Sequence, residues 1–175
     1  MRALVVYESM FGNTQDIAQS IGEGLSTHMG VDVVEVGDAP ATVDGIALLV
    51  VGGPTHAFSM SKPATRQSAA EQATHPLVST QRGIREWLAS LECGSHAPAT
   101  ATFDTRVDKP RLPGSAAQAA AKRLRRLGFG AAARAMSFYV STKNQLIDGE
   151  IERARQWGAR LGSASAPGIS GRRAS

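Results

Sequence analysis

The chain of 175 residues has the size of one domain with a buried core, and its 42% of hydrophobic residues allow a globular fold. A single cysteine, Cys93, excludes an internal disulfide and a metal site built from cysteines. No apolar run approaches the ~18 residues of a membrane-spanning helix, and no secretory leader precedes the first strand, so we expect a cytoplasmic protein without membrane insertion. The net charge of +4 arises between Arg106 and Arg126, where seven basic residues accompany one acid.

Apolar strand patterns alternate with helical patterns along the chain. We expect strands at residues 2–7, 31–36, 46–51, 97–103 and 133–140. We expect helices at residues 13–27, within 63–73, from about 80 onward, at 116–127 and after an Asp148 cap. The alternation implies an α/β fold with a parallel sheet and helices on both faces. Residues 163–175 are interpreted as a flexible tail that follows a domain at residues 1–162.

The connection between the second and third strands is short. Only residues 37–45 lie between them, whereas a parallel crossover usually takes about a dozen residues or more. The second helix is therefore expected to be a single turn or missing.

The turn at residues 9–14 leads from the first strand directly into the first helix, and a helix N-terminus with free N–H groups suits a phosphate. Ser9 and Thr14 offer hydroxyl donors, and Gly12 allows a close approach of the backbone. Asn13 is expected to cap the helix. No lysine or arginine lies between residues 5 and 21, so neutral donors and the helix dipole would hold the anion. The alternative is an ordinary strand–turn–helix without a ligand.

This stretch resembles the phosphate loop of the flavodoxin family, and the resemblance extends over roughly residues 1–162. Eight positions in a 17-residue frame satisfy the family pattern: Val5, Val6, Tyr7, Ser9, Gly12, Thr14, Ala18 and Ile21. The resemblance implies a flavodoxin-like, doubly wound sheet of five parallel strands in the order 2-1-3-4-5, and FMN as the cofactor. It assigns the phosphate to Ser9, Met10, Phe11, Gly12, Asn13 and Thr14.

The resemblance also implies that the loops after the third and fourth strands hold the isoalloxazine ring. The residues in question are Pro54, Thr55, His56, Ala57, Phe58, Phe103, Asp104, Thr105 and Arg106. Phe58 or His56 would lie against the ring, and Asp104 would accept a hydrogen bond from the ring N3–H. Arg106 would stabilise negative charge near N1 of the reduced flavin. The alternatives are that His56 is structural, that Phe58 only packs in its loop, and that Phe103 belongs to the core.

The sequence departs from electron-carrying flavodoxins at the ring. Those proteins usually have a tryptophan in the first ring loop, a tyrosine in the second and a glycine near flavin N5, whereas residues 55–60 contain none of these three residue types. Those proteins are also acidic, whereas this chain is basic. We therefore expect an FMN-dependent redox protein that serves either as an electron carrier for a partner protein or as a quinone reductase-like oxidoreductase, without an evident catalytic side chain.

Two other readings of the ligand stay open. In the first, the basic side chains at the opening of the expected ligand site, Arg106, Lys109 and Arg111, would bind the anionic tail of the deazaflavin F420. In the second, the protein is a sensor or scaffold that binds FMN without catalysis. The basic residues within 122–126 are interpreted as a solvated helix face, and nucleic-acid binding is not expected.

Overall fold

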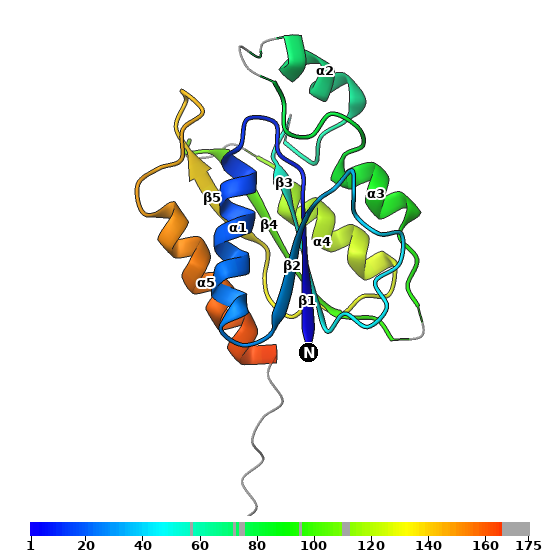
Figure 1. Ribbon diagram of the computed structural model, residues 1–175. Coiled ribbons are helices and arrows are strands. Elements are labelled where there is room, and N and C mark those ends of the chain that lie inside the picture. Colours follow the sequence, from blue (N-terminus) through cyan, green and yellow to red (C-terminus); the bar gives the residue numbers. More distant parts are fainter. Residues whose placement is uncertain (57, 72, 74–75, 95, 110–112, 166–175) are drawn as a thin grey trace, which may run out of the picture.

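Five parallel strands form one sheet in the order β2-β1-β3-β4-β5, with helices packed on it and α2 beyond the ends of the strands (Figure 1). The computed structural model describes residues 1–56, 58–71, 73, 76–94, 96–109 and 113–165. The strands are β1 (Arg2–Tyr7), β2 (Gly30–Glu35), β3 (Leu48–Pro54), β4 (Ala99–Val107) and β5 (Met136–Val140). The helices are α1 (Asn13–Ser26), α2 (Pro63–Glu71), α3 (Ile84–Ser90), α4 (Ala116–Arg126) and α5 (Glu150–Ser165). The predicted fold class and strand order are confirmed.

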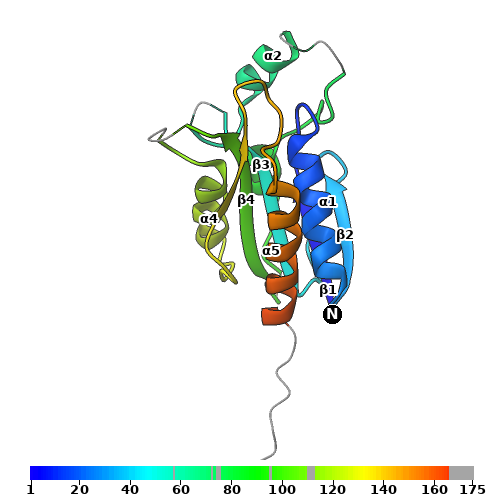
Figure 2. The ribbon, with the colours of Figure 1, turned by 90° about the vertical axis from the view of Figure 1, so that its left-hand side faces the viewer.

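Helices cover both faces of the sheet, and the strands read as apolar runs because both faces are buried (Figure 2). Successive residues of β1 alternate between the two cores: Val5 packs with α1 and α5, and Val6 packs with α3 and α4. The two helices of the first face approach closely. A Cβ at Gly24 would lie 2.0 Å from a backbone oxygen of α5, and one at Gly158 would lie 2.2 Å from a backbone oxygen of α1.

No helix connects β2 to β3 in residues 36–47, all of which the structure describes. The connection instead buries Val36, Ala39 and Val43 in the core beneath α3. Two side chains hold this loop by its carbonyl groups: Arg82 donates to Val36 at 2.9 Å, and Trp87 Nε1 donates to the Pro40 oxygen at 2.8 Å. The expected absence of a full second helix thus has a physical basis, because small apolar side chains of the loop fill the space.

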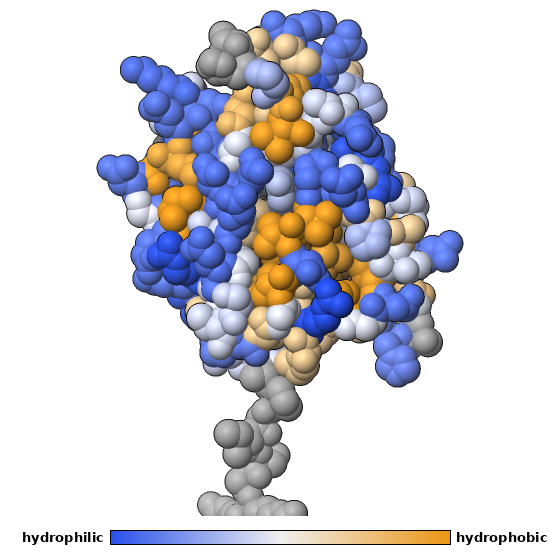
Figure 3. All heavy atoms as spheres, in the orientation of Figure 1, coloured by the Kyte–Doolittle hydropathy of each residue, from blue (hydrophilic) through white to orange (hydrophobic). Residues whose placement is uncertain are grey.

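Edge strand β2 is less buried than the sequence pattern suggests. None of its six residues is fully buried, and Val33 is 36% exposed, so hydrophobic side chains show on this face of the molecule (Figure 3). No helix in the described part of the chain is long and apolar enough to span a bilayer.

Several predicted boundaries are wrong. The first helix is capped by Gly12 rather than Asn13, and the last begins at Glu150 rather than at an Asp148 cap. The third helix begins at Ile84, about four residues late, because the preceding residues are used in loop contacts. The last helix continues to Ser165, and the rest of the predicted tail, 166–175, lies outside the described residues.

The largest difference is in β4, which continues to Val107 instead of ending at residue 103. Asp104, Thr105 and Arg106 are therefore strand residues rather than loop residues. All three pair with β5, and Asp104 and Thr105 also pair with β3. Asp104, for example, lies opposite Gly53 of β3 and Ser137 of β5.

Candidate functional site at the carboxyl edge of the sheet

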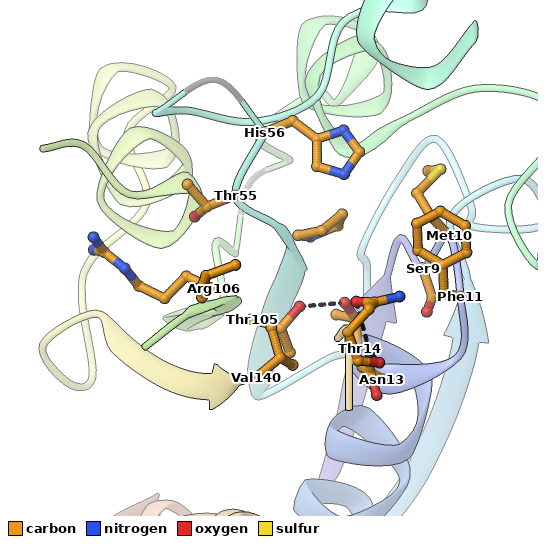
Figure 4. A pocket seen from close by; sticks show the side chains of 13 residues that line it. Ser9, Met10, Phe11, Asn13, Thr14, Thr55, His56, Thr105, Arg106 and Val140 are labelled. Atoms are coloured by element: carbon orange, nitrogen blue, oxygen red, sulfur yellow. Dashed lines mark hydrogen bonds between the residues drawn. The ribbon is translucent and has the colours of Figure 1, made fainter. Parts of the chain in front are cut away.

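A hollow of about 200 Å³ lies where β1, β3, β4 and β5 end (Figure 4). Such an edge is where ligands bind in open α/β sheets, because the strand order reverses between β1 and β3. Ten of the fifteen predicted cofactor residues line the hollow: Ser9, Met10, Phe11, Asn13, Thr14, Pro54, Thr55, His56, Thr105 and Arg106. Phe11 is 48% exposed and does not fill the hollow.

The turn before α1 presents open backbone amides to this hollow. Gly12 caps the helix with φ of 96°, a left-handed conformation that favours glycine, and no side chain bonds the first helical amides. Within the described chain, the N–H groups of Met10, Phe11, Asn13, Thr14 and Gln15 have no hydrogen-bond partner. These are donors that a helix must satisfy with water, side chains or a ligand. The turn therefore presents a group of free backbone donors to the hollow.

Hydroxyl groups complete the same end of the hollow. Ser9 Oγ accepts from the Gly12 N–H at 3.1 Å, so its own proton is left to donate. Thr14 Oγ1 and Thr105 Oγ1 lie 2.7 Å apart, and one donates to the other, leaving one further hydroxyl proton (Figure 4). Both threonines are buried, which fixes these donors in place.

A segment far along the sequence holds the turn from behind. Ser79 makes two bonds to Ser9: its N–H donates to the Ser9 carbonyl at 2.8 Å, and its Oγ accepts from the Ser9 N–H at 2.9 Å. The Ser79 hydroxyl in turn donates to Glu35 at 2.5 Å, and the Val78 N–H donates to the Met10 carbonyl. No sequence pattern indicated this support, because 70 residues separate Ser79 from Ser9.

Glu8 is buried next to the turn but points away from the hollow. Its carboxylate accepts from the Ser61 hydroxyl and, at 2.8 Å, from the Ile84 N–H. Burial raises the pKa of Glu8 above its ordinary value, although these bonds and the nearby Arg66 act in the opposite direction. Glu8 thus joins the turn to the start of α3 and adds no negative charge to the hollow.

The ring-side loop after β3 forms a tight turn. His56 and Ser59 exchange backbone hydrogen bonds of 2.9 and 3.0 Å, and Phe58 between them has φ of 70° and is 55% exposed. Ala57 lies outside the described residues. Burial, and secondarily the positive charge of Arg66, lowers the pKa of His56, so His56 is neutral at pH 7. Phe58 does not line the hollow but stands exposed at its rim.

Two predicted ring contacts are placed elsewhere. Phe103 is fully buried and packs edge-on against Phe138 and Trp157, which confirms the alternative that it belongs to the core. Asp104 is also fully buried and does not line the hollow. Its Oδ2 accepts from Thr55, Ser115 and the Ala117 N–H, so this oxygen serves the start of α4 rather than a ligand.

Arg106 lines the hollow, but its guanidinium turns toward α4 and donates to the Gly114 carbonyl at 2.9 Å (Figure 4). Of the other basic residues predicted at the mouth, Lys109 does not line the hollow and Arg111 lies outside the described residues.

The sequence interpretation missed three lining residues, Val107, Val140 and Asn144. Asn144 accepts two hydrogen bonds from the Asn13 side chain, at 2.9 Å on its backbone oxygen and 3.0 Å on its side-chain oxygen. The signal was available, since β5 is parallel to its neighbours and its carboxyl end meets the same edge.

Comparisons with known proteins agree with this geometry. The family model for flavodoxin matches residues 5–76, which contain the turn, β3 and α2. No curated protein matches the chain at a significant level. Among solved structures, a flavodoxin from the domain Archaea has a TM-score of 0.63 at 19% identity, covering 94% of this chain and 99% of its own. Oxidised flavodoxin 1 from Bacillus cereus has a TM-score of 0.66 at 16% identity, with 93% and 98% covered.

A larger protein contains the same fold as one part. The rubredoxin:oxygen oxidoreductase of Desulfovibrio gigas has a TM-score of 0.64 at 14% identity, and the match covers 94% of this chain but only 36% of that one. These identities establish a shared fold and carry no specific activity to this chain.

Proposed function

Because this chain belongs to the flavodoxin family, we propose that it binds FMN and works as a redox protein, exchanging electrons with a partner protein or with a small acceptor of the quinone class. The observation that supports this most is the group of five unpartnered amides in the described part of the chain, at residues 10, 11 and 13–15, beside a hollow at the sheet edge.

The phosphate end of FMN fits the turn without a cation. The open amides of residues 10–15 and the hydroxyls of Ser9 and Thr14 supply donors, each hydrogen bond to a charged group contributing about 1.5–3 kcal/mol. The N-terminal dipole of α1 adds to them. Burial keeps the acid nearest in sequence, Glu8, out of the hollow.

The ring end would lie along Pro54, Thr55 and His56, with Phe58 at the rim. A neutral His56 suits a neutral oxidised ring, because it brings no charge to it. The flavin supplies hydride and single-electron chemistry when bound, and the protein orients it and sets its potential. The chain itself holds the phosphate and limits access of water at the ring.

A titration of flavin-free protein with FMN and with riboflavin tests the proposal, because the two differ only in the phosphate. Flavin fluorescence should report an affinity for FMN at least 100-fold higher than for riboflavin. Equal affinities, or no binding of either, would overturn the proposal. F420 serves as a third ligand, and tighter binding of F420 than of FMN would transfer the site to a deazaflavin.

The choice between carrier and reductase follows from a reductive titration of the flavin-loaded protein. Uptake in two separate one-electron steps indicates a carrier, and uptake in a single two-electron step indicates a reductase. A loaded protein that accepts no electrons from dithionite would instead be a sensor or scaffold. A cytoplasmic setting is part of the same proposal and is tested by cell fractionation.

A further inference from the structure

A basic groove runs between α3 and α4, on the face of the sheet opposite α1 and α5. Its volume is about 450 Å³, and its walls carry Arg85, Lys122, Arg123 and Arg126 over a floor of Met60 and two alanines. No acidic residue is among its lining residues within the described chain. A second cavity of about 750 Å³ on the other flank of α4 adds Arg125 and Arg134.

These cations are distinguished by their clustering, because no carboxylate lies among them in the described residues. Lys62, Lys143 and Arg160 also form no ion pair within those residues, but they belong to other segments. Elsewhere in the described chain, five ion pairs neutralise Arg2, Arg66, Arg153 and Arg155. Within the same residues, none of Lys122, Arg123, Arg125, Arg126 and Arg134 lies within ion-pair distance of a carboxylate. The face around α4 is thus the uncompensated positive part of a chain whose net charge is +4.

Helix stability accounts for only some of this charge. Arg123, Arg125 and Arg126 occupy the last turn of α4, where cations interact favourably with the helix dipole. Arg85 on α3 and Arg134 beyond α4 are outside that turn. A helix that needed only a charged C-terminus would not require cations from three separate segments around two cavities.

The basic groove is connected to the ring-side turn of the candidate site. Arg85 donates to the carbonyls of Ser61 at 3.0 Å and Met60 at 2.8 Å, and its Nη2 lies 3.4 Å from the Ser59 hydroxyl. Ser59 closes the turn that carries exposed Phe58. Lys122 follows the first residue of α4 by six residues, or about 9 Å along the helix. Arg126 lies ten residues, or about 15 Å, from that start, so a protein large enough to cover the basic groove would extend to the sheet edge that carries the hollow.

We propose that the basic groove is the docking surface for an acidic redox protein, a proposal that rests on the redox function proposed above. Clustered cations beside a redox site steer an acidic partner toward it and fix its orientation. The charge is spread from α3 across α4 to Arg134, which matches a row of carboxylates on a protein better than one small anion. A small anion would also need free backbone amides. The amides at the start of α4 are already bonded, and they lie at the opposite end of the helix from the cations of the basic groove.

A nucleic acid is the other polyanion that such a surface would attract. No aromatic side chain lines either cavity in the described chain, whereas proteins that bind single strands use aromatic rings to stack bases. The lack of aromatic side chains argues against single strands but not against duplex DNA, so the experiment below includes a DNA duplex as a competing ligand.

The test measures binding of a plant-type [2Fe–2S] ferredoxin, a strongly acidic redox protein, to the purified full chain by biolayer interferometry. Raising NaCl from 20 to 300 mM should weaken binding at least tenfold. The triple variant Lys122→Ala, Arg123→Ala, Arg126→Ala should bind at least tenfold more weakly at 20 mM NaCl. The matched control Arg2→Ala, Arg155→Ala, Arg160→Ala removes the same charge from other surfaces and should bind within twofold of the parent.

Three results would overturn the proposal: equal losses in the two triple variants, no binding of ferredoxin at 20 mM NaCl, or tighter binding of a 24-base-pair DNA duplex through the same three residues. FMN affinity, measured separately, should stay within twofold in both variants, since none of the six residues lines the hollow. Failure to bind FMN would refute the proposed redox function, and failure to bind ferredoxin would refute the docking surface. The two results are distinguishable because ferredoxin binding is measured on flavin-free protein.

Discussion

The starts of α1 and α4 have the same local architecture and opposite chemistry. Both helices follow a parallel strand at the carboxyl edge of the sheet, β1 for α1 and β4 for α4. The amides that begin α4 are all bonded: Ala116 to Thr55 at 2.9 Å, Ala117 to Asp104 at 3.1 Å, and Gln118 to its cap Ser115 at 3.1 Å. Those that begin α1 have no partner in the described chain until Asp16.

This difference shows that two helix N-termini at the same sheet edge can differ in whether their amides are free to accept a ligand. Asp104 provides the anion for α4 internally, as a buried carboxylate on the neighbouring strand. At α1 the corresponding cap is Gly12, which has no side chain to offer, and the donors face the hollow. The dipoles of the two helices are alike, so the capping residues decide which end is a site and which is scaffold.

The largest expected effect comes from removing the internal anion of α4. Asp104→Ala leaves the Thr55 hydroxyl, the Ser115 hydroxyl and the Ala117 N–H without their acceptor in a buried place. Unsatisfied buried donors cost about 1–3 kcal/mol each, and partial relaxation brings the expected loss to about 3 kcal/mol in the free energy of unfolding. Urea denaturation followed by circular dichroism measures it.

Two companion variants make the Asp104 result interpretable. Asp16→Ala changes an exposed acid in the first turn of α1 and should cost less than about 1 kcal/mol. Asp104→Asn keeps one acceptor oxygen and should fold even where the alanine variant does not, with about half the loss. If Asp104→Ala lowered the free energy of unfolding as little as Asp16→Ala, water would replace the carboxylate. The amides at the start of α4 would then be as accessible as those of α1, which would contradict the comparison.

The second expected effect is at α1. Thr14→Val keeps the shape of a buried side chain and removes one hydroxyl of the pair with Thr105. FMN affinity should fall about tenfold, which corresponds to about 1.4 kcal/mol, because a bond to a charged phosphate is lost. Flavin fluorescence gives the affinities, and riboflavin affinity should stay within about threefold. An equal loss for both flavins would place Thr14 beside the ring instead of the phosphate.

The sequence predicted the open helix start and missed the closed one for a physical reason. The turn at residues 9–14 is a local motif, and its glycine, hydroxyls and adjoining helix pattern are all readable within 17 residues. The bonds around Asp104 join β3, β4 and α4, and they exist because β4 continues past residue 103. Its last residues, Asp-Thr-Arg-Val, lack the apolar alternation that marks a strand. They stay extended because β5 pairs with all four of them and β3 pairs with Asp104 and Thr105.

The same distinction between local and long-range signals applies to the rest of the molecule. The alternation of strands and helices and the missing helix between β2 and β3 were predictable from apolar runs and connection lengths, and the strand order followed from the resemblance carried by the local turn motif. The support of Ser9 by Ser79 was not predictable, because 70 residues separate the partners. For Asn144 the parallel direction of β5 indicated which edge its loop would reach, but no local motif marked this residue within the loop.

A smaller effect, the dependence of binding on salt, distinguishes the hollow at α1 from the basic groove. FMN affinity should change less than about threefold between 50 and 500 mM NaCl, because partly buried donors are weakly screened. Among the described residues that line the hollow, Arg106 is the one cation, and its guanidinium donates to the Gly114 carbonyl. Docking of the ferredoxin at the basic groove should instead weaken at least tenfold over a narrower range. Fluorescence titrations at the two salt concentrations measure the first value. A steep loss of FMN affinity would mean that Arg106 leaves Gly114 and contacts the phosphate.

The smallest expected effect comes from Asp16, whose charge should act in opposite directions on the stability of α1 and on FMN binding at its N-terminus. Asp16 is exposed in the first turn, where its negative charge favours the free helix but opposes a phosphate bound at the same end. Asp16→Asn should therefore lower the free energy of unfolding by about 0.5 kcal/mol and raise FMN affinity about twofold, two changes of opposite sign from one charge. Denaturation of the flavin-free protein and FMN titration at 20 mM NaCl measure both. Weaker FMN binding in this variant would show that Asp16 orders the turn, and the α1 start would then be less open than its unpartnered amides indicate.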